Sequence, residues 1–264
     1  MRRRYRPLRG LAYSLTINLG FRYAPPQALC YRLLRRLLYS LNLMQNRISP
    51  RSLKIALAVV VFLSVAFAQG PPVETGPLRK PDLVELTKLD PTIKLDIRYA
   101  TRNNFLGKAV YKQARAFLQR PAAEALVRVN QTVRKQGYGL VVFDGYRPWS
   151  VTKVFWDVTP TDKKIFVADP AKGSRHNRGC AVDLSLFDLK TGTVVKMPSE
   201  YDEMTERAHI NYECTTAEPR RLRELLRAAM TAEGFVVYEP EWWHYDYKDW
   251  KEYPITNLKF SEIR

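Results

Sequence analysis

A histidine and an aspartate lie seven residues apart in the stretch from Ser174 to Asp183, which also contains Gly179. The residues after Gly179 are mainly apolar and predict a buried strand. Asp183 lies inside this predicted strand, where a carboxylate is costly unless it is paired or binds a metal. Because zinc accepts imidazole and carboxylate ligands, we expect His176 and Asp183 to bind zinc with a third ligand from elsewhere.

The third ligand is expected in the sequence Glu-Trp-Trp-His at residues 241–244. A catalytic zinc site uses three protein ligands and keeps a fourth position open for water. His176, Asp183 and His244 would form such a set. Glu241, three residues before the last ligand, is then placed to take a proton from the zinc-bound water. We predict that His209, the remaining histidine of three in the chain, is structural or exposed.

Arg147 follows an apolar stretch, residues 139–143, that predicts a short buried strand. Two interpretations are open for this residue. It is either an active-site cation that stabilises the oxyanion of an attacked carbonyl, or a surface arginine paired with Asp144.

Four ordered stretches of the chain match motifs of a known family: 99–107, Asp-Gly-Tyr-Arg-Pro at 144–148, Ser-x-His-x-x-Gly-x-Ala-x-Asp at 174–183, and Glu-x-x-His at 241–244. Over roughly residues 80–260, the sequence resembles the zinc D-alanyl-D-alanine dipeptidases of the vancomycin-resistance type. These enzymes are related to the DD-carboxypeptidases and to the Hedgehog signalling domain.

The resemblance implies hydrolysis of the dipeptide D-Ala-D-Ala at a site with one zinc ion. By this resemblance, the zinc ligands are His176, Asp183 and His244. Glu241 would be the general base, and Arg147 would stabilise the transition state.

Two further positions follow from the resemblance. Ser174 is expected near the substrate. The family segment Met-Gly-Thr-x-Phe-Asp corresponds to residues 197–202 here, but Pro198 and Ser199 replace Gly-Thr. This departure leaves the contribution of Asp202 to substrate binding open.

Two alternative functions remain open from the sequence. One is a DD-carboxypeptidase or another peptidoglycan peptidase, and the other is a catalytically silent zinc domain that binds wall peptides. Glu241 and Arg147 argue against a silent domain, because a structural zinc site requires neither residue.

The elements that must position these residues can be predicted from periodicity and from Pro and Gly signals. Helices are predicted at 121–136, after Pro148, and from Glu218 to Gly234. Strands are predicted at 97–99, 139–143, 180–186, 193–197 and 235–238, and residues 241–247 follow the last of these closely. Helices and strands mix without a regular alternation of strand and helix. We therefore predict an α+β single domain with a mainly antiparallel central sheet flanked by helices. The resemblance implies that this domain is of the Hedgehog/DD-peptidase type.

The net charge of +17 is concentrated at the start of the chain. Residues 1–54 hold 12 of the 43 Lys and Arg and none of the 26 Asp and Glu, which leaves a charge of +5 for the remainder. A domain that is only mildly basic gives no support for a nucleic-acid partner. We expect a small D-amino-acid dipeptide as its partner.

Residues 44–68 have the order of a secretory signal peptide: basic residues, an apolar stretch at 55–68, and Ala-Phe-Ala before Gln69. The apolar stretch is short for a membrane span, which needs about 20 residues. Residues 1–43 are either a basic amphipathic leader or untranslated sequence before a start at Met44. We assign residues 69–81 to a linker and residues 82–264 to the zinc dipeptidase domain.

The expected location is therefore the periplasm or the cell envelope, with membrane contact only through the leader during export. Cys180 and Cys214 would remain after cleavage. A disulfide between them and two free thiols are both open, because Cys180 lies in the predicted buried strand.

Export predicts a mature chain that begins at Gln69, because signal peptidase cleaves after a small-x-small site. N-terminal sequencing of the secreted protein measures this directly. A mature product that retains Met44 or earlier residues would contradict the prediction.

Overall fold

The computed structural model describes residues 70–214 and 216–263. The predicted leader and signal peptide lie outside the described residues. From Gly70 onward the chain forms one compact unit. No helix or strand precedes Leu83 among the described residues.

A five-stranded sheet forms the centre of the domain, with strand order β2-β4-β5-β7-β6. Its strands are β2 (Lys94–Leu95), β4 (Tyr138–Asp144), β5 (Ala181–Asp188), β6 (Phe235–Tyr238) and β7 (Glu241–Tyr247). The pair β2–β4 is parallel, and the other three pairs are antiparallel. The α+β class is therefore confirmed, whereas the expected mainly antiparallel sheet is corrected to a mixed sheet.

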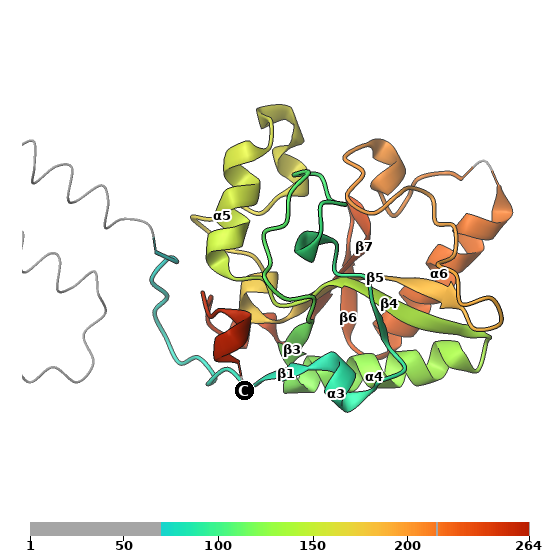
Figure 1. Cartoon of the computed structure of the whole chain (residues 1–264), viewed down its shortest axis with the longest axis horizontal. Helices are drawn as coiled ribbons and strands as arrows, with labels where there is room; N and C mark the ends of the chain where they lie inside the picture. The colour runs from blue at the N-terminus through green and yellow to red at the C-terminus, as the bar shows by residue number, and fades with distance from the viewer. Residues whose placement is uncertain (1–69, 215, 264) are drawn as a thin grey trace, which may run out of the picture. The chain divides into compact units, whose positions relative to one another are not determined.

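Two long helices pack against this sheet and against each other, α4 (Arg120–Arg134) and α6 (Ala217–Ala232). Figure 1 shows α4 running beside β4, with α6 next to it. In α4, Leu126, Val129 and Val133 recur at helical spacing and are fully buried. A glycine with positive φ follows each helix, Gly137 at 88° and Gly234 at 85°. Glycine adopts this conformation without the steric cost of a Cβ, so both predicted helix ends are explained.

Two strand pairings create the framework of the site. Asp183 of β5 lies opposite His244 of β7 in the antiparallel register. On the other side of β5, Asp183 lies opposite Asp144, at the end of β4, after a register shift. Neighbouring positions across an antiparallel pair are about 4.5–5.5 Å apart, so these pairings alone bring three chemically active residues together.

Within residues 70–214 and 216–263, the smaller elements are β1 (Leu83–Glu85), α3 (Leu86–Leu89), β3 (Phe117–Gln119), α5 (Trp149–Val158) and six 3-10 turns. The sequence does not predict β1 or β3, which pair with each other in a separate two-stranded sheet. The strand predicted at 97–99 is wrong, because Arg98–Ala100 form a 3-10 turn. The strand predicted at 193–197 reduces to a single bridge between Phe187 and Val194.

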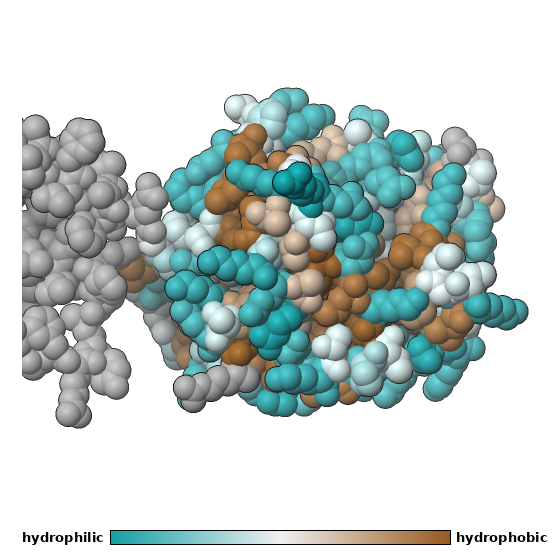
Figure 2. Space-filling view, viewed as in Figure 1, coloured by the Kyte–Doolittle hydropathy of each residue, from teal (hydrophilic) through white to brown (hydrophobic). Residues whose placement is uncertain are grey.

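The surface is largely hydrophilic on the face shown in Figure 2, with hydrophobic side chains in a broken band across it. The large exposed apolar side chains of the described residues are Val73, Leu89, Val158, Ile165, Val194, Val236 and Leu258. Within the described part of the chain, no helix is both long enough and apolar enough to cross a membrane. Cys180 and Cys214 are free thiols.

Candidate active site

His176 is presented by a tight turn between α5 and β5. The turn is a 3-10 helix, His176–Arg178, and it ends at Gly179 with φ of 68°. A Cβ on Gly179 would lie 2.3 Å from Leu83 Cδ2, so both the backbone angle and the space require glycine. The turn therefore needs the glycine that the sequence places between the histidine and the strand carrying Asp183.

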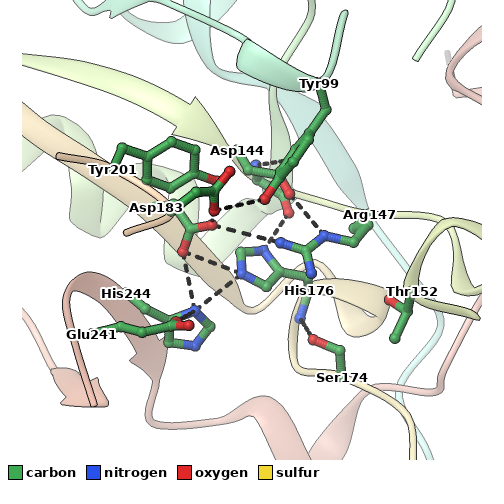
Figure 3. Close-up of polar contacts among 12 residues, drawn as sticks. Tyr99, Asp144, Arg147, Thr152, Ser174, His176, Asp183, Tyr201, Glu241 and His244 are labelled. Carbon is green, nitrogen blue, oxygen red and sulfur yellow. Dashed lines mark hydrogen bonds and ion pairs between the residues drawn. The ribbon is translucent and has the colours of Figure 1, made fainter. Parts of the chain in front are cut away.

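The three predicted zinc ligands come together in one cluster (Figure 3). His176 Nε2 lies 3.1 Å from His244 Nδ1 and 3.3 Å from Asp183 Oδ1. His244 Nδ1 lies 3.0 Å from Asp183 Oδ1. Zinc bonds of about 2.0–2.1 Å in a tetrahedral site separate neighbouring ligand atoms by roughly 3.4 Å. The spacing and the chemistry of these donor atoms fit a zinc ion.

The second nitrogen of each imidazole supports the same assignment. His176 Nδ1 lies 2.7 Å from the carbonyl oxygen of Gly145, and His244 Nε2 lies 3.0 Å from Asp246 Oδ1. An N–H donated to each of these acceptors leaves the nitrogen that faces the cluster free to bind a metal. This pairing is the usual outer contact of metal-binding histidines, and it fixes the orientation of both rings.

Asp183 is 3% exposed and is surrounded by compensating groups. Tyr201 donates its hydroxyl to Asp183 Oδ2 at 2.9 Å, and the Arg147 guanidinium lies 3.6 Å from the same oxygen. Burial acts to raise the pKa of Asp183, but His176 and His244 outweigh it and hold this pKa well below its usual range. The carboxylate is therefore ionised, as a metal ligand must be.

Arg147 is buried, and it both pairs with Asp144 and faces the cavity. Its Nε donates to Asp144 Oδ2 at 2.9 Å, and its guanidinium stacks over Phe155 at 4.6 Å from the ring centre. Tyr111 donates to the other oxygen of Asp144 at 2.9 Å. The expected pair with Asp144 therefore exists, but it is buried beside the ligand cluster instead of lying on the surface, with the guanidinium 3.6 Å from Asp183.

Glu241 lies at the start of β7, where the pairing with β6 shifts register. In a regular strand, residues three apart face opposite sides, so this shift allows Glu241 and His244 to share one site. Glu241 Oε2 lies 3.7 Å from His244 Nδ1. Burial raises the pKa of Glu241 to about 8. Near neutral pH this carboxyl group can therefore carry or lose a proton, and it lies beside the ligand cluster.

Asp202 is a site residue whose role the sequence leaves open. Its backbone has φ of 65°, which is uncommon for a residue other than glycine. Oδ1 accepts a hydrogen bond from Tyr99 at 2.9 Å, and Oδ2 is buried without a partner. Burial raises the pKa of Asp202 to about 7. An unpartnered carboxylate oxygen inside a cavity is suited to a positively charged ligand.

A cavity of about 100 Å³ opens beside the cluster. Pockets for drug-sized ligands are larger, at about 300–1,000 Å³, so this one suits a small substrate. All six predicted site residues line it, and the structure adds lining residues that the motifs did not single out for the site: Tyr99, Phe105, Phe155, Ile165, Phe166, Val167, Ala168, Arg175, Asp202, Met204, Tyr238 and Trp243. Tyr99 belongs to the matched stretch 99–107, but its sequence motif predicts no individual role for it at the site.

The remaining residues named from the sequence are Ser174 and His209. Ser174 lines the cavity, and its Oγ accepts a hydrogen bond from the His176 amide at 3.2 Å. His209 lies outside the ligand cluster, with its ring 6.2 Å from that of Phe166.

The ligand cluster, the buried arginine and the glutamate thus converge on one cavity. A family model described as D-ala-D-ala dipeptidase, of the peptidase M15 class, matches residues 79–263. The chain therefore belongs to this peptidase family, as the resemblance of the motifs predicts.

Curated relatives agree with this assignment. The chain is 36% identical over 180 residues to the D-alanyl-D-alanine dipeptidase of Escherichia coli (strain K12), covering 68% of this chain and 92% of that protein. It is 34% identical over 186 residues to the D-alanyl-D-alanine dipeptidase of Enterococcus faecium, covering 64% and 92%. A solved structure of the LdcB LD-carboxypeptidase aligns over 73% of this chain and 80% of that chain with 19% identity and a TM-score of 0.35, too low to establish a shared fold.

Asp202→Asn should remove a stability cost that depends on pH. The pKa of this carboxyl is about 7 in the folded protein and about 4 in an unfolded chain. Between these values the unfolded chain has lost the proton while the folded protein keeps it, so rising pH destabilises the wild type. The stability of the variant relative to wild type should therefore increase from about pH 5 to about pH 8, as measured by urea unfolding.

The control for this measurement is Asp157→Asn, at an exposed side chain paired with Lys153. It should show little change between the two pH values. A flat or decreasing difference for Asp202→Asn would contradict the assignment of a raised pKa.

Proposed function

We propose that this protein is a zinc-dependent D-alanyl-D-alanine dipeptidase. The observation that carries the proposal is the convergence of three metal-ligating atoms, a partly buried glutamate and a buried arginine on one small cavity. The family match and the names of the curated relatives support the choice of substrate.

His176, Asp183 and His244 would hold the zinc ion. When bound, zinc polarises the carbonyl of the scissile peptide and lowers the pKa of a water molecule at the site. The chain supplies the remaining functions of the reaction through its own side chains.

Glu241 takes the proton from the attacking water and delivers it to the amine that leaves. A carboxylate with a pKa near the working pH suits both transfers, because neither protonation state is strongly favoured. The contact with His244 Nδ1 at 3.7 Å places this carboxylate next to the ligand cluster, where the water must be activated.

Arg147 stabilises the negative charge that develops on the attacked carbonyl oxygen. Its guanidinium is held by Asp144 and by stacking on Phe155, so it is oriented before the substrate binds. A fixed cation in a site largely shielded from water stabilises a developing oxyanion without reorganising during the reaction.

The two charged ends of a free dipeptide have candidate partners in the cavity. The unpartnered Oδ2 of Asp202 would accept the ammonium group. Arg175 stacks on Trp250 at 4.6 Å and lines the cavity together with Ser174, and we assign these two residues to the carboxylate. A charge buried without its partner is costly, so a substrate that lacks either charge should bind poorly.

We also propose that the enzyme acts outside the cytoplasm. The sequence of residues 44–68 supports this proposal through its signal-peptide pattern. An exported dipeptidase would act on dipeptides released from wall precursors or wall fragments.

The proposed substrate is tested by incubating the purified protein and zinc with D-Ala-D-Ala, with its N-acetylated form, and with a pentapeptide precursor ending in D-Ala-D-Ala. Hydrolysis of the free dipeptide alone is expected, because acetylation removes the charge that Asp202 would bind. Hydrolysis of the acetylated dipeptide or of the pentapeptide at a similar rate would indicate a carboxypeptidase. No turnover of any of the three would indicate a silent domain.

Glu241 and His244 should respond differently to substitution although they lie only three residues apart. His244→Ala should lose zinc and activity together, because it removes a ligand. Glu241→Ala should keep its zinc and lose about 10²–10⁴-fold in turnover, the usual contribution of a general acid–base group. Elemental analysis and dipeptide hydrolysis on both purified variants measure these effects. Loss of zinc from Glu241→Ala would show that Glu241 is a ligand or a structural support instead.

A further inference from the structure

Glu74 lies before the first strand and outside the residues matched by the peptidase family model, 79–263. Its carboxylate nevertheless makes two specific contacts with the peptidase domain. Arg178 donates from its NH2 group to Glu74 Oε1 at 2.5 Å, and the Ile255 amide donates to Glu74 Oε2 at 2.7 Å. Both oxygens of one carboxylate are therefore used to join two distant parts of the chain.

Arg178 is the last residue of the 3-10 turn that begins with His176. Its side chain is 10% exposed, and its second guanidinium nitrogen donates to the carbonyl of Tyr253. The guanidinium also lies over the Trp250 ring, 5.5 Å from its centre. In the described part of the chain, Glu74 is the one carboxylate within ion-pair distance of this mostly buried cation. Removal of that partner would leave the charge poorly compensated.

The same turn is tied to the C-terminal segment at its backbone. The Thr256 amide donates to the Asn177 carbonyl at 3.0 Å. Asn177 in turn donates its side-chain amide to the Arg147 carbonyl at 2.8 Å. A displacement of residues 253–256 would therefore be transmitted to the His176 turn and to Arg147.

We propose that Glu74 is a positioning residue of the metal centre. By binding Arg178 and the Ile255 amide at once, its carboxylate fixes the C-terminal segment against the turn that presents His176. The part of the proposal that concerns zinc depends on the proposed function, whereas the ordering of the turn can be measured in the metal-free protein.

Hydrogen exchange on the purified exported protein without metal tests the ordering of the turn. The variant is Glu74→Gln, which keeps the shape of the side chain and removes its charge. Amides of Gly179, Cys180 and Thr256 are protected by hydrogen bonds of the turn. Their exchange should become about tenfold faster, because hydrogen bonds to a charged partner are the stronger kind.

Glu252→Gln is the matched control. Glu252 forms an ion pair with Arg79 at 2.5 Å, and it therefore joins the same N-terminal segment to the same C-terminal region without touching Arg178. Both side chains of that pair are about half exposed, at 52% and 45%, so its loss should have little effect. Exchange at the three amides should stay as in the wild type.

Zinc release into a chelator then links the turn to the metal centre. Glu74→Gln should release zinc faster than the wild type and Glu252→Gln should not, and dipeptide hydrolysis should fall only in the first. In an Arg178→Gln background, Glu74→Gln should add little to either effect, because the two residues act through one contact.

Unchanged exchange in Glu74→Gln, or an equal increase in Glu252→Gln, would overturn the proposal. Faster exchange without faster zinc release would show that Glu74 only stabilises the turn, and it would overturn the proposed role of Glu74 at the metal centre. A wild type that binds no zinc would contradict the proposed function, while the exchange data would still decide whether Glu74 orders the turn. If Glu74→Gln does not fold, Glu74→Asp, which shortens the side chain, replaces it with the same expected direction.

Discussion

The buried carboxylate of Asp183 is the constraint on which the rest of the site depends. An isolated carboxylate at 3% exposure would be strongly destabilising, and it is tolerated because His176, His244, Arg147 and Tyr201 surround it. Each of these partners comes from a different part of the fold: a turn, a neighbouring strand, the exit of another strand and a distant loop. The need to compensate one charge therefore explains why segments far apart in the sequence meet at this point.

The acidic residues of the site differ in pKa because their surroundings differ. Asp183 is held ionised by the neighbouring imidazoles, whereas burial raises the pKa of Glu241 to about 8 and that of Asp202 to about 7. Groups with such different values can divide the work of a reaction. A permanently ionised carboxylate such as Asp183 can bind a cation. Glu241 and Asp202 both titrate near neutrality, so each can exchange a proton or pair with a charged substrate group.

The sequence predicts the ligand cluster and the major helices because their signals are local. A periodic apolar face, a glycine after a helix and a polar residue in a buried strand can all be read without knowing the fold. The mixed sheet could not be predicted in this way, since β2 is two residues long and its parallel pairing with β4 is a long-range contact. For a related reason, Tyr201 was missed and the role of Asp202 was left open. Their segment departs from the family pattern, and only tertiary contact shows that Tyr201 binds Asp183 and that an Asp202 oxygen has no partner.

The site combines a rigid framework with a more variable wall. Asp183, His244 and Glu241 belong to paired strands, so small changes elsewhere should leave the geometry of these groups intact. By contrast, Ile165 and Met204 come from connections outside the central sheet. Tyr238, at the end of β6, donates a hydrogen bond from its hydroxyl to the Ile165 carbonyl at 3.1 Å. Loops tolerate substitution and insertion better than the strands that they connect. Changes in substrate size among related domains should therefore arise in these loops, while the bond-breaking chemistry stays with the strands and with the turn that carries His176.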